Sequence, residues 1–179
     1  GAMLLYERIK FAKKKLLKWT FIITSLIFLV IFLEDYRYHA PRAGASGMLF
    51  GRKGAMEFVA GVEKDYQKIV VSRSLSEPQI YVAFYLKWDP AGYQKETNDW
   101  LRYKELGLPF LDQLGEYSLG KYLFKNINYL DDSKIPNVLL VGKPQEFPER
   151  IVPTQIIKYP NQIPAIYIVD PAAVTLVQN

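Results

Sequence analysis

The sequence predicts an α/β protein in which a single N-terminal transmembrane helix is followed by a small α/β sandwich domain with a mixed sheet. Three observations predict it: an uncharged apolar run near the N-terminus, helix-type patterns with capping residues after it, and short strand-like runs that accumulate toward the C-terminus. With 179 residues, half of them hydrophobic, the chain is long enough for one domain with its own core and an appended segment.

The first 33 residues divide into three segments. We expect residues 1–3 to be a vector-derived scar, residues 4–15 to be a basic juxtamembrane segment, and residues 16–33 to span a membrane. The run WTFIITSLIFLVIFL holds no charge, and 18 helical residues extend for ~27 Å, close to the ~30 Å of a bilayer's hydrocarbon core. The run lacks the polar face of a core helix and the nearby small-residue cleavage site of a secretory signal, the two alternatives.

The distribution of charge predicts the orientation of this span. Residues 1–33 carry six of the 23 Lys and Arg residues and one of the 18 Asp and Glu residues, so the rest of the chain is electrically balanced. Basic residues before the span place the N-terminus in the cytoplasm and the C-terminal domain outside it, at the cell membrane. A balanced domain lacks the basic surface that nucleic-acid binding needs, so the expected partner is the lipid bilayer.

Side chains that favour membrane interfaces flank the span. We expect Lys18 to extend its ammonium to the surface, and the aromatic rings of Trp19, Tyr36 and Tyr38 to lie at the two interfaces. Ahead of the span, apolar residues recur at helical spacing between lysines (Leu5, Ile9, Ala12, Leu16). This pattern fits either a helix on the inner leaflet or an extension of the spanning helix.

Residues 34–51 are predicted to be a linker, because their second half, HAPRAGASGMLFG, is rich in Ala, Gly and Pro. The extracytoplasmic α/β domain then covers residues 52–179. Helical patterns are predicted over 52–66, over 77–87 from the capping-box form S-x-x-Q at Ser76, and over 90–106 from Asp89-Pro90 to Gly107. Strands are predicted over five short apolar runs: 69–71, 122–127, 138–141, 154–158 and 165–169, with a hairpin loop at 160–162.

Composition excludes several kinds of catalytic site. The chain has no cysteine and only one histidine, His39, so thiol catalysis and a zinc site built from Cys and His are excluded. The G-x-S-x-G elbow and the Gly-rich phosphate loops are absent, and the glycines of GRKGAMEF have the wrong spacing for a P-loop. We therefore assign no catalytic residue, no metal ligand and no cofactor to this chain.

The stretch VVSRSLSEPQIYVAFY, residues 70–85, carries the candidate ligand-binding residues Arg73, Ser74 and Glu77. They follow a predicted strand, and ligands of α/β folds bind at the carboxyl ends of strands. The interpretation that the sequence favours is an ordinary helix entry in which Arg73 and Glu77 pair with each other, and ligand binding is the alternative. The paired carboxylates Glu34-Asp35 have two interpretations as well: a polar stop after the span, or a contact to a lipid phosphate through a divalent metal.

A longer stretch carries a family resemblance. YQKIVVSRSLSEPQIYVAFYLKWDPAGYQ, the span that ends in EDYRYHAPR, and LGKYLFKNINYLDDSKIPNVLLVGKPQEFP resemble the C-terminal region of bacterial GT-C glycosyltransferases akin to protein O-mannosyltransferases and aminoarabinose transferases. The resemblance covers residues 16–170. It implies the last span and the extracytoplasmic domain of an enzyme that transfers sugar from a polyprenyl-phosphate donor to an acceptor outside the cytoplasm.

The same resemblance limits what this chain does. The family's catalytic acidic residue and its metal or lipid-phosphate contacts belong to early outer loops of the bundle, and no segment here matches them. The expected role is therefore accessory: covering the active site, recognising an acceptor or mediating assembly with the remaining transmembrane bundle, while any divalent metal belongs to the full-length enzyme. The alternative is a free-standing single-span protein whose outer domain binds a protein partner or a cell-wall glycan.

Overall fold

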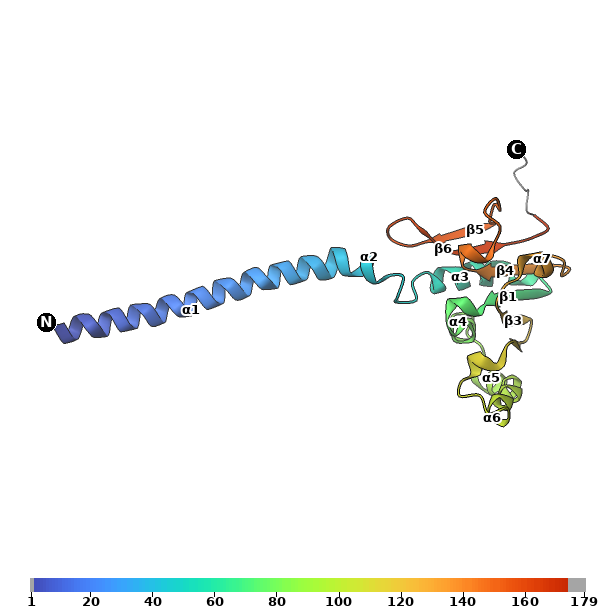
Figure 1. Cartoon of the computed structure of the whole chain (residues 1–179), viewed down its shortest axis with the longest axis horizontal. Helices are drawn as coiled ribbons and strands as arrows, with labels where there is room; N and C mark the ends of the chain where they lie inside the picture. The colour runs from blue at the N-terminus through green and yellow to red at the C-terminus, as the bar shows by residue number, and fades with distance from the viewer. Residues whose placement is uncertain (1, 174–179) are drawn as a thin grey trace. The chain divides into compact units, whose positions relative to one another are not determined.

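The computed structural model describes the backbone of residues 2–173 and the side chains of residues 13–111 and 113–173 (Figure 1). The chain forms two compact units, residues 1–44 and residues 45–179, which we describe separately. Gly1 of the expected scar and the side chains of Leu5, Ile9 and Ala12 lie outside the described residues.

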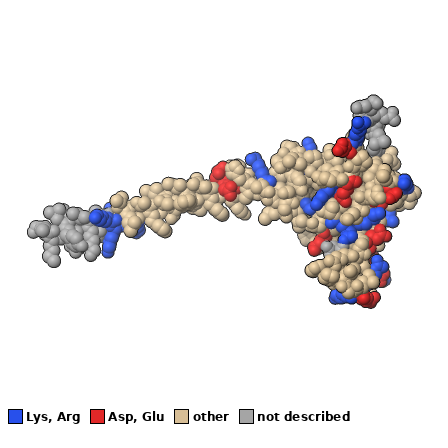
Figure 2. Space-filling view, in the orientation of Figure 1, with Lys and Arg blue, Asp and Glu red and all other residues tan. Residues whose placement is uncertain are grey.

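The first unit is helical throughout its described backbone. It consists of α1 (Ala2–Glu34), the π-helical segment η1 (Asp35–His39) and α2 (Ala40–Gly44). Within it, residues 13–44 form one helical stretch that is long and apolar enough to cross a membrane, with a mean hydropathy of 2.4 in its most apolar window. None of that window is buried, and Phe21 is 74% exposed. In space-filling view the run is free of charge between basic and acidic residues (Figure 2).

The helix continues where the sequence predicted a linker from residue 34. Glu34 accepts a hydrogen bond from His39 Nε2 at 3.1 Å, and the rings of Phe32 and Tyr36 stack at 5.9 Å. Pro41 has no N–H to donate, and the π-helical segment before it shifts the hydrogen-bond register. Residues 34–44 of the predicted linker are therefore helical, and residues 45–51 form neither helix nor strand.

The second unit is built on one mixed sheet of six strands in the order β2-β3-β1-β4-β6-β5. The strands are β1 (Lys68–Ser72), β2 (Tyr117–Leu119), β3 (Tyr122–Lys125), β4 (Val138–Gly142), β5 (Gln155–Lys158) and β6 (Pro164–Val169). β1 runs parallel to both β3 and β4, whereas β2, β6 and β5 are antiparallel to their neighbours. The predicted single helix followed by a small α/β domain with a mixed sheet is confirmed.

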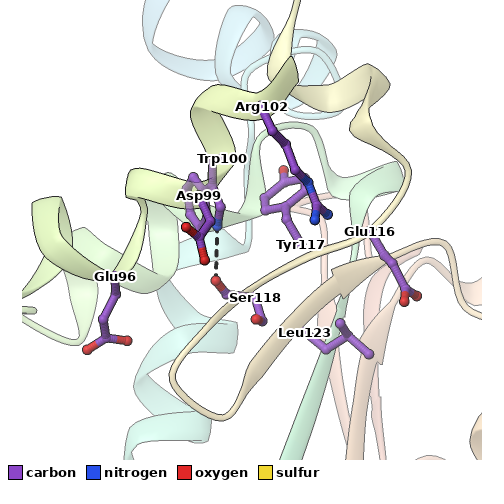
Figure 3. A pocket seen from close by; sticks show the side chains of 8 residues that line it. All are labelled: Glu96, Asp99, Trp100, Arg102, Glu116, Tyr117, Ser118 and Leu123. Atoms are coloured by element: carbon purple, nitrogen blue, oxygen red, sulfur yellow. Dashed lines mark hydrogen bonds between the residues drawn. The ribbon is translucent and has the colours of Figure 1, made fainter. Parts of the chain in front are cut away.

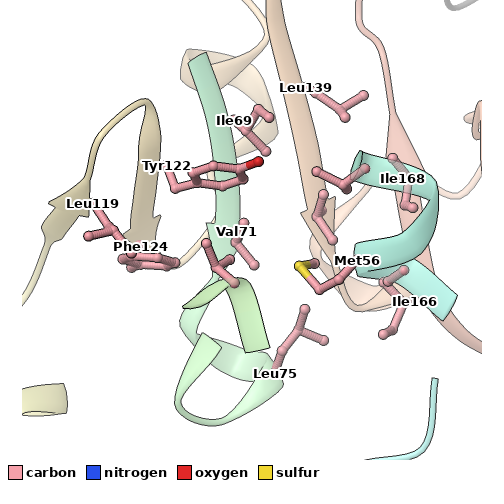
Figure 4. Packing of buried hydrophobic residues seen from close by; sticks show 14 of the residues in the cluster. Met56, Ile69, Val71, Leu75, Leu119, Tyr122, Phe124, Leu139, Ile166 and Ile168 are labelled. Atoms are coloured by element: carbon pink, nitrogen blue, oxygen red, sulfur yellow. The ribbon is translucent and has the colours of Figure 1, made fainter. Parts of the chain in front are cut away.

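Most of the helices cover one face of this sheet. They are α3 (Arg52–Val62), η3 (Arg73–Leu75), α4 (Pro78–Tyr85), α5 (Pro90–Glu96), η4 (Asn98–Leu101) and η5 (Leu111–Leu114), each of which contributes to the core on that face. The short segments η2 (Glu63–Asp65) and α6 (Arg102–Glu105) follow α3 and η4 in the chain. Met56 of α3 packs against Ile166 and Ile168 of β6 in the larger core (Figure 4). Alternate strand residues such as Ile69 and Val71 face this side, as the two-residue period of a strand requires.

The opposite face is covered by α7 (Tyr129–Asp132), η6 (Pro144–Glu146) and the loops around them. Val70 and Leu140 point to this side and pack with Ile127 and Phe147 in a second, smaller core. The central strands β1 and β4 are thus apolar on both faces, which explains why they read as unbroken apolar runs in the sequence.

The capping residues that the sequence predicts are confirmed at some helix ends and wrong at others. Asp89 caps α5 by accepting a hydrogen bond from the Gly92 N–H at 2.7 Å, and Gly107, at φ +68°, follows the last helical turn of α6. Ser76 does not cap α4, because its own φ is +60° and Glu77 is the residue that precedes the helix. The predicted helix 90–106 is divided into α5, η4 and α6, and β2 and α7 were not predicted.

A tyrosine connects the start of β1 to the end of β6. The Tyr66 hydroxyl donates to Asp170 Oδ2 at 3.0 Å, and burial together with this carboxylate raises the pKa of Tyr66 to about 12. Because the pKa in the folded protein lies above the ordinary value of about 10, the protonated hydroxyl stabilises the fold below pH 10 and this contribution is lost between pH 10 and pH 12.

We therefore predict that Tyr66→Phe lowers the free energy of unfolding by about 1–2 kcal/mol at pH 8, and that the difference from the wild type shrinks as the pH rises toward 12. Urea denaturation followed by tryptophan fluorescence measures both. Tyr103→Phe is the matched control, because no hydrogen bond of the Tyr103 hydroxyl is found among the described residues. A wild-type advantage that stays constant from pH 8 to pH 12 would contradict this role of the hydroxyl.

Candidate functional site

The candidate site lies at the carboxyl ends of the parallel strands β1, β3 and β4. After β1 the chain enters the face of the larger core through Leu75, whereas after β3 it enters the opposite face through Ile127. Since β1 and β3 are neighbours in the sheet, their outgoing loops separate at this point. Such a divergence is the topological switch point at which open α/β sheets bind ligands.

A single carboxylate holds these strand ends together. Glu146, in η6 after β4, accepts hydrogen bonds from the hydroxyl of Ser72, the last residue of β1, at 2.5 Å and from that of Ser74, in η3, at 2.7 Å. It also accepts from the backbone N–H of Ile127, after β3, at 3.3 Å and from that of Lys143, after β4, at 2.8 Å. Four donors from three chain segments therefore converge on one side chain.

Gly142 provides the room for this carboxylate. A Cβ atom at position 142 would lie 2.7 Å from Cδ1 of Ile127 and 2.8 Å from Oε2 of Glu146, both closer than real Cβ contacts. A side chain at position 142 would therefore displace the end of the Ile127 side chain and the Glu146 carboxylate from their positions.

The turn between β1 and α4 has an unusual backbone. Ser76 and Glu77 have positive φ angles, +60° and +46°, which residues other than glycine rarely adopt. Glu77 also precedes a proline, which restricts its backbone further. Arg52 of α3 holds this turn, because its guanidinium Nε and Nη2 donate to the Leu75 carbonyl at 3.3 Å and 3.0 Å. Strained backbone that is fixed by its surroundings is characteristic of functional sites.

The predicted ligand-binding residues Arg73, Ser74 and Glu77 line one hollow of about 370 Å³ at this switch point. Ser76, Pro78, Tyr117 and Asn126 complete its lining. Asn126 follows β3, so the hollow is bounded by both diverging loops. Sequence reasoning named three of the residues that line this hollow and missed Asn126. It also missed Glu146, which does not line the hollow but binds Ser74 beside it.

The two charged residues that line this hollow, Arg73 and Glu77, do not pair with each other. Arg73 Nη1 donates to the Gly115 carbonyl, and Arg73 Nε is buried without a hydrogen-bond partner among the described residues. The ion pairs in this part of the chain include neither Arg73 nor Glu77, so the predicted structural pair is not formed. Glu77 is exposed. The hollow therefore presents a guanidinium, a carboxylate, hydroxyls and an amide to an incoming molecule.

A different hollow, of about 250 Å³, lies between α5, η4 and the β2–β3 hairpin (Figure 3). Its lining includes the acidic residues Glu96, Asp99 and Glu116, and the indole N–H of Trp100 donates to the Ser118 carbonyl at 3.1 Å across it. Within the described residues, no group of three or more His, Cys, Asp or Glu side chains is placed to hold a metal ion. We therefore assign no metal to these acids.

Each adjacent acidic pair of the sequence, Glu34-Asp35 and Asp131-Asp132, has a member with a structural partner. Glu34 pairs with His39, and Asp132, which is 2% exposed, pairs with Lys125 Nζ at 2.8 Å and accepts from the Asn128 N–H at 2.8 Å. The serines of the switch point donate to Glu146, and the single histidine belongs to the helical unit. This arrangement favours binding over nucleophilic catalysis.

Comparison with known proteins returned no matching family model, no matching curated protein and no matching solved structure. The assignment of this site therefore stands on its geometry.

We predict that Glu146→Gln lowers the free energy of unfolding by about 2–3 kcal/mol, because an amide provides one acceptor oxygen where the carboxylate provides two, and directs an N–H group at donors. Denaturant titration of the detergent-solubilised chain measures the loss. Glu149→Gln, three residues away and exposed, is the control and is expected to change stability by less than about 0.5 kcal/mol. Equal stability of the two variants would disprove the central role of Glu146.

Proposed function

We propose that this chain is the membrane-anchored, non-catalytic C-terminal region of a GT-C type glycosyltransferase with a polyprenyl-phosphate-linked sugar donor. We further propose that its α/β domain recognises the acceptor outside the cytoplasm. The anchor is supported by one helix of sufficient length and apolarity and by the resemblance of residues 16–170. The observation that carries the recognition role is the hollow that unites Arg73, Ser74 and Glu77 at the switch point.

The chemistry of this hollow suits a polyhydroxylated acceptor. A sugar hydroxyl both donates and accepts hydrogen bonds, so it is recognised best by a site that offers both kinds of partner. Arg73 supplies donors, Glu77 supplies acceptors, and Asn126 supplies both. A volume of about 370 Å³ is at the small end of the range for small-molecule sites, which suits one or two sugar units.

The recognition role is tested by ligand-observed saturation-transfer NMR on the detergent-solubilised chain, with mannose and N-acetylglucosamine as probes. We predict that Glu77→Gln weakens sugar binding at least fivefold, because it removes the only carboxylate in the lining. Glu149→Gln, which is exposed outside the hollow, is the matched control. Absence of saturation transfer, or equal transfer in both variants, would exclude this hollow as a sugar site.

The expected orientation has its own test, because the chain contains no cysteine and a single introduced thiol has no background. We predict that Lys95→Cys, exposed on α5, reacts with a membrane-impermeant maleimide in intact cells, whereas Lys13→Cys reacts only after lysis. Labelling of both positions from the same side would show that the helix does not cross the membrane. Extension of the natural reading frame upstream into further apolar spans would distinguish the glycosyltransferase from a free-standing single-span protein.

A further inference from the structure

Another hollow, of about 470 Å³, lies at the amino end of α3 and has a different lining from the switch-point hollow. It is formed by the turn before α3, the loop after β4 and the β5–β6 hairpin. Ser76 is the one residue that lines both hollows. None of the residues that line it is acidic, whereas Arg52 and Lys143 are both cationic.

Arg52 is a buried positive charge without a carboxylate. It is 6% exposed, and its guanidinium donates to the carbonyls of Leu75 and Phe50, the latter from Nη1 at 3.0 Å. Carbonyl oxygens satisfy N–H groups but carry no formal charge, and the ion pairs of the described residues do not include Arg52. A buried cation that is not neutralised is costly, so an anion that reaches it gains a strong interaction.

Lys143 adds a second charge to the same lining. It is half-buried, and its ammonium has no hydrogen bond or ion pair within the described part of the chain. The nearby carboxylate of Glu146 is engaged by Ser72, Ser74 and two backbone N–H groups, and Glu146 does not line this hollow. Both cations therefore face the hollow without a negative partner in its wall.

We propose that this hollow binds an oxyanion of the phosphate class. A phosphate offers several acceptor oxygens at once, which suits the guanidinium of Arg52, the ammonium of Lys143 and the hydroxyls of Ser46 and Ser76. Arg52 is the first residue of α3, and the amino end of an 11-residue helix favours negative charge as well. This proposal does not rest on the sugar-binding role proposed above.

The rim of the hollow indicates how the phosphate can be carried. Leu49 and Ile163 line it with exposed fractions of 44% and 58%, and the adjacent Met48 is 81% exposed. These apolar side chains are available to the hydrocarbon part of an amphiphile whose phosphate lies between Arg52 and Lys143. Free phosphate and a phospholipid headgroup share the recognised group, and the experiment separates the two sources.

Binding is read from the protection of Lys143 against acetylation by an amine-reactive ester, quantified by mass spectrometry on the full chain in dodecyl maltoside. The probes are inorganic phosphate and the short-chain lipid dihexanoyl phosphatidic acid, with acetate at matched ionic strength as the anion control. We expect one or both phosphate probes to slow acetylation of Lys143 at least fivefold, while exposed Lys95 reacts at an unchanged rate.

The pattern of protection identifies the source. Protection by both probes indicates recognition of the phosphate itself, and protection by the lipid alone indicates that the apolar rim takes part. If neither phosphate probe protects Lys143, or if acetate protects it equally well, the proposal is overturned.

Variants provide a second reading through calorimetric titration with the probe that protects. Lys143→Gln is expected to weaken binding at least fivefold and Lys95→Gln to leave it unchanged, although each removes one positive charge. Arg52→Lys, which keeps the charge but loses the fork that holds Leu75, is expected to bind more weakly than the wild type and more tightly than Arg52→Gln. Because Lys143 makes no contact that the fold requires through its ammonium, unaltered binding by Lys143→Gln would refute the site even if the Arg52 variants do not fold.

Discussion

The carboxylate of Glu146 is the constraint on which the arrangement of this domain's loops depends. Three parallel strands end side by side, and each leaves polar groups that need a partner at the edge of the sheet. Glu146 accepts from all three segments, through Ser72 and Ser74, Ile127 and Lys143. It can do so because Gly142 leaves the space that a side chain would fill. The loops after β1 and β3 are thereby held at defined positions although they diverge to opposite faces.

The turn after β1, which this carboxylate holds, places its residues in the linings of two hollows. The hydrogen bond from Ser74 to Glu146 fixes the first half of this turn. The hydrogen bonds from the Arg52 guanidinium to the Leu75 carbonyl fix the second half. Between these two attachments and α4, Ser76 and Glu77 adopt left-handed conformations that a free peptide would rarely hold. One side of the turn lines the hollow with Arg73 and Glu77, and Ser76 also lines the hollow with Arg52 and Lys143. The linings of two hollows with different chemical groups therefore depend on the same few hydrogen bonds.

Some of this site was accessible to sequence reasoning. Arg73, Ser74 and Glu77 stand directly after an apolar strand, and the rule that ligands bind at strand carboxyl ends predicts them as candidates; the structure places all three in the lining of one hollow. Glu146 was missed because it lies 74 residues from Ser72 in the chain, and its neighbourhood KPQEF resembles an ordinary turn. Arg52 lies in the glycine-containing stretch GRKGAMEF before a helix. The residues next to it in the sequence do not indicate that it is buried without an acidic partner.

The amino-acid sequence by itself determined the elements whose stability is local or compositional. These are the apolar helix near the N-terminus, because its length and lack of charge are properties of the residues themselves, and the caps at Asp89 and Gly107, because their partners lie within one helical turn. Tertiary structure alone decided the pairing of the short strand β2 with β3, the left-handed turn at Ser76 and the convergence on Glu146. Their stabilising partners come from distant parts of the chain, and only folding brings those parts within hydrogen-bonding distance.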